Sequence, residues 1–278
     1  MDTFEVPPHT DEMTKPLVVQ EAWPSEPKFD RPLKLPQGFL SRVDYLLHHP
    51  DDIVEALKRD VDLWALSRTL FMITVIMAAL YGGVMGATNW LQGSGIPLNL
   101  QFLTMLVTAI KVPLLFLLTL LIVVPPIYVS STFVGSRLTF SQLVGVLLAS
   151  LAFTTVVLAS MASVAFFFSL TTRNYTFIKL LHVAFFAYAG LAGLAYLVRS
   201  VHAVVGEVKH ELWKWLFIAW LLLYMFVGTQ LAWVMRPFVG DPDLKFQLFR
   251  PRSGNFYESV YQSVVQLQQD MEKPGKRQ

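Results

Sequence analysis

Apolar residues are gathered in five long runs, at about 64–90, 112–129, 143–170, 177–198 and 213–235. The hydrocarbon core of a bilayer is about 30 Å thick, and about 20 apolar residues in a helix span it. Backbone groups in lipid must be hydrogen-bonded within their own segment, so each run is expected to be a helix. The pattern predicts an all-α integral membrane protein whose five transmembrane helices form a bundle over residues 64–235.

A moderately apolar stretch, 98–110, comes before the second run and is separated from it by Lys111 and Pro113. Because proline disfavours helix in the residue before it and lacks the backbone N–H, this stretch is predicted to be an interfacial or re-entrant piece. Lys111 would then extend to the lipid headgroups, and the span would begin at Pro113 and end at Pro125 and Pro126. One long, kinked helix is the alternative.

The two ends of the chain are more polar than the bundle. Residues 1–40 are rich in proline, have no apolar period and are predicted to form an extended tail. Over 41–63, apolar residues recur at helical spacing opposite charged ones, which predicts an amphipathic interfacial helix on the bilayer surface. The C-terminal tail, 236–278, is expected to contain a short helix opened by a capping box at Asn255. That helix carries one apolar stripe, expected to pack on the bundle or on a partner: Tyr257, Val260, Tyr261, Val264 and Leu267.

Acidic residues are absent from most of the predicted bundle. The 278-residue chain has 22 Lys and Arg against 20 Asp and Glu, yet residues 63–206 contain six basic residues and no carboxylate. That composition excludes carboxylate catalysis and an acidic proton relay within this stretch. The absence of Cys excludes disulfides and thiolate metal sites. No cofactor or metal is expected, and the basic residues form no soluble patch of the kind that binds nucleic acid.

Two ionisable residues, Lys179 and His182, lie one helical turn apart in the fourth run and form the candidate intramembrane polar site. Ionisable residues inside a membrane are rare and commonly functional, so the pair indicates an anion or headgroup site or a proton-sensitive switch. The structural alternative, which is favoured, is that Lys179 extends to the nearby membrane surface while His182 hydrogen-bonds a neighbouring helix.

Small residues recur in three of the runs, where they allow helices to approach closely. Packing within one bundle is the favoured interpretation, and a dimer interface is the alternative. The candidate helix-packing residues are Gly82 and Gly86 in the first run, Gly145 and Ala149 in the third, and Gly190 and Gly193 in the fourth.

The layout of the chain resembles that of the Yip (Rab-interacting) membrane-protein family and its bacterial relatives. The resemblance covers about residues 40–235 and is carried by a Leu-Leu-x-x-Pro element at 46–50, the small-residue run 79–86, and Lys-Val-Pro-Leu-Leu at 111–115. The tail after Arg236 departs from the family pattern. Membership would imply a role in membrane organisation or trafficking without catalysis.

These observations favour a non-enzymatic polytopic protein that acts as a scaffold, assembly or membrane-organising subunit through its soluble ends. The expected partners are the lipid bilayer and other membrane proteins or a second copy of the chain. The alternative is a channel or transporter for an anionic or lipid-like substrate, which the excess of basic residues in 63–206 suggests.

A bacterial cytoplasmic membrane is the expected location. The basic residues in the predicted loops favour a cytoplasmic N-terminus, which puts the C-terminus outside.

Overall fold

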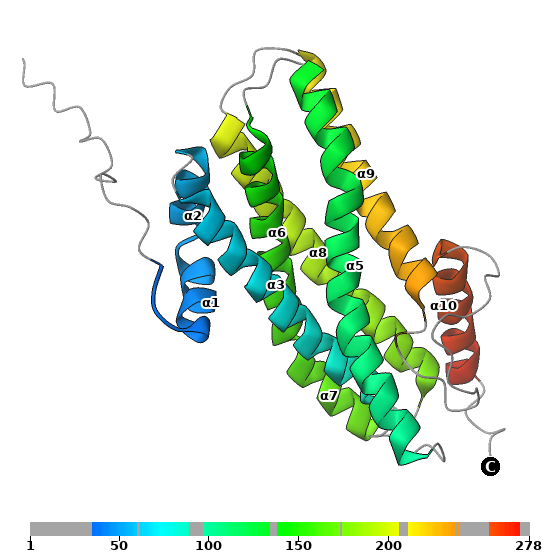
Figure 1. Ribbon diagram of the computed structural model, residues 1–278. Helices are drawn as coiled ribbons and strands as arrows, with labels where there is room; N and C mark the ends of the chain where they lie inside the picture. Colours follow the sequence, from blue (N-terminus) through cyan, green and yellow to red (C-terminus); the bar gives the residue numbers. More distant parts are fainter. Residues whose placement is uncertain are drawn as a thin grey trace, which may run out of the picture. The chain divides into compact units, whose positions relative to one another are not determined.

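The computed structural model describes residues 35–59, 62–88, 97–133, 138–172, 174–205, 211–236, 238 and 256–272. All regular secondary structure in these ranges is helical (Figure 1). Five segments are long and apolar enough to cross a membrane: Leu63–Gly86, Leu98–Phe133, Phe140–Thr171, Tyr175–Val205 and Trp215–Met235. The chain is therefore an all-α, multi-pass membrane protein, and the fold class predicted from its apolar runs is confirmed.

The second span is one continuous helix, α5 (Leu98–Phe133), with Pro113, Pro125 and Pro126 inside it. The prediction that 98–110 is a separate interfacial or re-entrant piece is wrong, and the alternative of one long helix is correct. A 36-residue helix is about 54 Å long, well beyond the thickness of the hydrocarbon core. Proline inside a membrane helix is tolerated because neighbouring helices and hydroxyl side chains satisfy the freed carbonyls. Just after the last two prolines, Ser130 donates from Oγ to the carbonyl of Pro126 at 2.6 Å, an additional side-chain bond within α5.

The third span is divided in two, which its continuous apolar run did not predict. Helices α6 (Phe140–Ser160) and α7 (Ala162–Thr171) meet at Met161, whose backbone N–H bonds the carbonyl of Leu158 in a tighter turn. A capping box of Thr139 and Gln142 opens α6. Helix α6 is buried along most of its length and packs against both α3 (Leu63–Gly86) and α8 (Tyr175–Val205) (Figure 1). It therefore forms the centre of the bundle.

The last span, α9 (Glu211–Met235), is the least covered by the rest of the protein and packs mainly along α5 (Figure 1). At one end of this interface Trp220 donates from Nε1 to the Ser130 hydroxyl at 2.8 Å, and at the other Lys111 contacts Met235. These pairings show that α5 and α9 run antiparallel. Most of the α9 surface is consequently left for lipid or for another membrane protein.

Two short helices stand where a single amphipathic helix over 41–63 was predicted: α1 (Phe39–His48) and α2 (Pro50–Lys58). Pro50 begins α2 because its fixed backbone angle suits the first helical position. Leu46, Ile53 and Leu57 are almost completely buried in the main core, where α2 packs on α6 and α8. These side chains of the predicted apolar face therefore pack within the protein, and the interfacial position of the segment stays a prediction.

Helix α10 (Phe256–Glu272) confirms the helix predicted in the C-terminal tail and packs on α8 and α9 (Figure 1). Its packing face differs from the predicted stripe, because Ser263 is buried while Tyr257, Tyr261 and Val264 are exposed. The predicted cap at Asn255 and the predicted extended tail up to residue 34 lie outside the described residues.

Candidate functional site

His182 of the candidate intramembrane site is buried between two helices and contacts Tyr81 of α3. One hydrogen bond of 2.7 Å joins His182 Nδ1 to the Tyr81 hydroxyl, and the two rings meet edge to face with centroids 5.6 Å apart. Both side chains are at most 1% exposed. His182 Nε2 is buried and has no hydrogen-bond partner in the described part of the chain. The contact is the hydrogen bond to a neighbouring helix that the structural alternative predicted, and it joins α8 to α3.

Lys179, the other member of the predicted pair, is only partly buried near the start of α8. His182 turns toward Tyr81 of α3, and Phe186 continues the same face, with its ring 5.6 Å from that of Tyr81. Lys179 and His182 therefore lie on the same helix, but only His182 makes the buried contact with Tyr81.

A second buried ionisable residue, Lys111, was not predicted as a site residue. Its side chain is 5% exposed, and Nζ donates to the main-chain carbonyl of Met235 at 3.0 Å. The expectation that Lys111 extends to the headgroups is wrong, because α5 continues past it and places its amine at the end of α9. One turn earlier, Thr108 donates from Oγ1 to the carbonyl of Phe238 at 3.0 Å. The last carbonyls of a helix lack partners within it and carry partial negative charge, so Lys111 caps α9.

The sequence contains a feature that indicates the contact of Lys111 with a buried polar group. Lys111 interrupts a nearly continuous apolar stretch from 98 to 129, and a charge within such a stretch needs a polar partner. The neighbouring Pro113 instead favoured a helix boundary at this point. The lysine was therefore predicted to lie at the membrane surface.

The predicted packing residues of the first span bring α3 and α5 into close contact. A Cβ atom added to Gly82 would lie 2.6 Å from the Thr108 carbonyl oxygen, and one added to Gly86 would lie 2.7 Å from the Met105 Cα. These atoms belong to backbone, which cannot move without moving the helix. Glycine is therefore needed at both positions for the observed helix separation.

Three of the remaining four packing residues also lie in helix interfaces. Gly145 of α6 is covered by Leu57 of α2, Ala149 is fully buried, and Gly193 of α8 packs on Thr154 of α6. The Ser150 hydroxyl donates to the carbonyl of Gly193 at 2.8 Å, which adds a polar link between α6 and α8. Gly190 is exposed with no atom within 4 Å of an added Cβ, so its predicted packing role in this bundle is wrong.

The turn between α1 and α2 carries the polar contacts of the N-terminal end. The Tyr45 hydroxyl donates to Asp52 Oδ2 at 2.7 Å, and Arg199 of α8 pairs with Asp51 at 2.6 Å. Burial, followed by the hydrogen bond to Asp52 and its negative charge, raises the pKa of Tyr45 to about 12. The Arg199–Asp51 pair is well exposed, so it contributes little stability and mainly orients α2 toward α8.

These contacts define a polytopic membrane protein whose buried polar groups join helices to one another. No cluster of three or more His, Cys, Asp or Glu side chains able to hold a metal ion occurs among the described residues. Compared with models of known protein families, with curated proteins and with solved structures, the chain matches none of them.

Proposed function

We propose that this protein is a non-enzymatic membrane-organising subunit that holds partner proteins through its two ends. The observation that carries the proposal is that the first and last described helices, α1 and α10, are short and dock on the bundle by one face. The other face of each helix exposes large apolar side chains. These are Leu40 and Leu47 on α1, and Tyr261 and Val264 on α10, next to Tyr257, whose ring is exposed while its hydroxyl lies 3.4 Å from Thr229 of α9.

The exposed residues of α10 support a docking role because they form one stripe. Tyr257, Tyr261 and Val264 follow helical spacing, and Tyr261 is 71% exposed. Tyrosine is enriched in protein interfaces because it combines a large apolar ring with a polar hydroxyl. Ser263 on the opposite side is buried, which fixes the direction in which the stripe faces.

The character of the buried core favours this proposal over a channel or transporter for an anionic or lipid-like substrate. Buried hydroxyls in three spans donate to the carbonyl four residues earlier in their own helix: Thr74, Thr119 and Ser200. Each of these hydroxyl protons is bonded within its own helix, so these three residues offer no donor to a substrate. The described core is thus better suited to rigid packing than to conduction.

We further propose that the protein lies in a bacterial cytoplasmic membrane with its N-terminus inside and its C-terminus outside. An odd number of spans puts the two ends on opposite sides of the membrane, and the basic residues of the predicted loops favour an inner N-terminus. Because the chain has no Cys, single substitutions Ser41→Cys and Ser259→Cys give a clean labelling test. An impermeant maleimide added to intact cells should label Ser259→Cys alone, and the reverse labelling would overturn the orientation.

Photo-crosslinking in cells tests the docking role. A photoreactive amino acid at Leu40 or Tyr261 should yield a discrete crosslinked protein, because both side chains project away from the bundle. The matched control is Ile218, an exposed apolar residue within the α9 span, which is expected to crosslink mainly to lipid. If Leu40 and Tyr261 also give lipid adducts only, the proposed function is refuted.

A further inference from the structure

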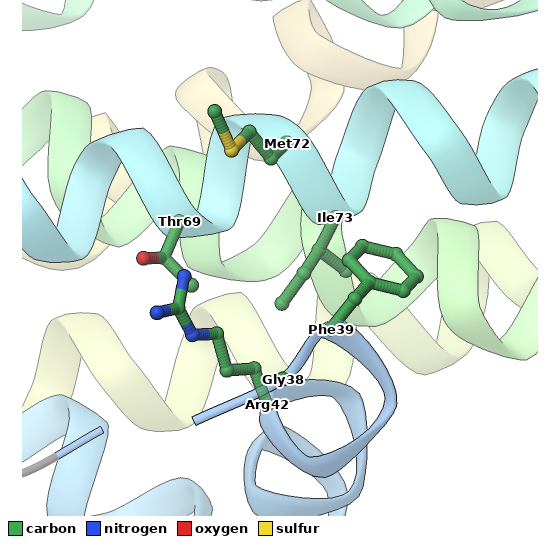
Figure 2. Close-up of a pocket in the computed structure, with 6 residues that line it drawn as sticks. All are labelled: Gly38, Phe39, Arg42, Thr69, Met72 and Ile73. Carbon is green, nitrogen blue, oxygen red and sulfur yellow. The ribbon is translucent and has the colours of Figure 1, made fainter. Parts of the chain in front are cut away.

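A cavity of about 220 Å³ opens between α1 and α3 (Figure 2). Phe39, Met72 and Ile73 supply most of its apolar wall, and Arg42 and Thr69 supply its polar side. In the close-up, the Arg42 side chain leaves α1 and brings its guanidinium group beside Thr69 of α3, while the ring of Phe39 lies next to Ile73 (Figure 2). The cavity therefore combines a cationic side with an apolar one.

The Arg42 guanidinium keeps most of its hydrogen-bonding capacity. Nε donates to the carbonyl of Pro36 at 3.1 Å, which anchors the group at one edge. A guanidinium carries five N–H donors, so the Nη nitrogens retain four. The ion pairs among the described residues do not include Arg42, and no Asp or Glu is among the described residues that line the cavity. The site thus lacks a negative charge that a ligand could bring.

The position of the cavity along α3 places it at the edge of the membrane. Arg68 is the last charged residue of α3, and the residues from Thr69 to Gly86 contain no charge. Arg68 is exposed and lies one turn before Met72, on the same side of the helix as that lining residue. Arg42 thus lines the cavity and Arg68 lies on the neighbouring turn of α3, where the charged start of the helix gives way to its apolar part.

The surface next to the cavity suits an acyl chain. Phe71, Met72 and Ile76 of α3 are each more than 40% exposed and lie within the apolar part of the span. The cavity itself has the volume of about seven water molecules, enough for a phosphate group and its ester links but not for a whole lipid. Any lipid bound there must extend its chains along α3.

We propose that this cavity, which Arg42 lines and which lies beside Arg68 and the exposed apolar face of α3, binds one anionic phospholipid. The Nη groups of Arg42 hold the phosphate in the geometry that guanidinium groups favour, and Arg68 adds attraction at the mouth. An acyl chain lies over Phe71, Met72 and Ile76. The bound lipid would fill the space between α1 and α3 and fasten the N-terminal helices to the membrane surface.

Native mass spectrometry of the full-length protein tests the proposal. The protein is released from mixed micelles that contain phosphatidylglycerol and phosphatidylcholine, and the retained lipid is counted. Wild type should retain one phosphatidylglycerol in preference to phosphatidylcholine. Arg42→Gln should weaken that retention about tenfold or more, as expected for the loss of a charged hydrogen-bonding group. Arg42→Lys should retain part of the preference, because it keeps the charge without the two-pronged geometry.

The matched control is Arg199→Gln, which removes an exposed arginine that already pairs with Asp51. It should leave lipid retention unchanged. Arg68→Gln covers the case in which Arg42→Gln disturbs folding, since Arg68 is exposed and its loss should weaken retention without lowering the melting temperature. Equal retention of both lipids by wild type, or equal losses in Arg68→Gln and Arg199→Gln, would overturn the proposal.

Discussion

The close contact of α3 with α5 gives the sharpest test of how the bundle is packed. Gly82 and Gly83 are neighbours on α3, but only Gly82 faces α5. A Cβ on Gly82 would lie 2.6 Å from the Thr108 carbonyl oxygen and 3.1 Å from both Ala109 Cα and Val112 Cβ, whereas a Cβ on Gly83 would meet nothing within 4 Å. Adjacent Gly→Ala substitutions therefore compare a blocked position with an open one.

The structure sets the expected size of the difference. Ordinary contacts begin at 3.4 Å, so Gly82→Ala forces backbone atoms apart by about 0.8 Å in the largest helix interface of the bundle. Overpacking of this kind costs about 1–3 kcal/mol. Alanine also favours helix over glycine by about 1 kcal/mol, a gain that both variants share. We expect Gly83→Ala to be neutral or stabilised by up to about 1 kcal/mol and Gly82→Ala to be about 1–3 kcal/mol less stable than Gly83→Ala.

Reversible unfolding of the purified protein in mixed micelles, followed by far-ultraviolet circular dichroism, measures this difference. The two variants change the same residue type at adjacent positions of one helix, so differences in expression or micelle binding largely cancel. If Gly82→Ala is as stable as Gly83→Ala, α3 and α5 do not approach as closely as described, and the assignment of Gly82 as a packing residue fails.

Three further changes test individual contacts in the same unfolding assay. Tyr81→Phe should cost about 1–3 kcal/mol, because it leaves His182 Nδ1 buried without its hydrogen bond. Lys111→Met should cost a similar amount, about 1–3 kcal/mol, since the end of α9 loses its cap. The pKa of Tyr45 is raised from 10.0 to about 12, so its contribution to stability is complete below pH 10 and disappears as the pH rises through about 12. Asp52→Asn should shift the ultraviolet titration of Tyr45 toward lower pH.

Each of these changes has a control within the chain. Tyr188→Phe removes the hydroxyl of a tyrosine that is 60% exposed and should be neutral. Lys179→Met changes a partly exposed lysine and should cost less than Lys111→Met. Tyr45→Phe should reduce the loss of stability between pH 10 and about 12 by the contribution of this one residue. If each control variant lost as much stability as the variant it is compared with, burial and hydrogen bonding would not explain the effects.

The five spans could be predicted because the membrane imposes a simple rule on the sequence. A segment that crosses lipid must be helical, long and apolar, and those properties are visible one segment at a time. The helix of the C-terminal tail was predicted for a similar reason, from its apolar spacing. The amphipathic spacing over 41–63 likewise predicted helix there, although the break between α1 and α2 was not predicted.

The contacts between the spans could not be predicted in the same way. A transmembrane helix is apolar on all sides, so its pattern does not distinguish the face that meets lipid from the face that meets a neighbour. Gly190 and Gly193 illustrate this, because they lie one turn apart and only Gly193 packs on α6. The error at Lys111 has another cause. Proline ends helices reliably in water, but in a bundle the surrounding helices support α5 through Pro113.

Lys111 connects the buried core with the surface proposed to bind partners. Its amine holds the last carbonyl of α9 beside α5, about 20 Å from the Leu98 end of that helix by helical rise. Helix α10 then packs on α8 and α9, where the Tyr257 hydroxyl lies 3.4 Å from Thr229 of α9. Because α10 rests partly on α9, the residue that secures the end of α9 also positions the exposed tyrosines. Lys111 therefore links the packing of the spans to the position of the exposed residues on α10.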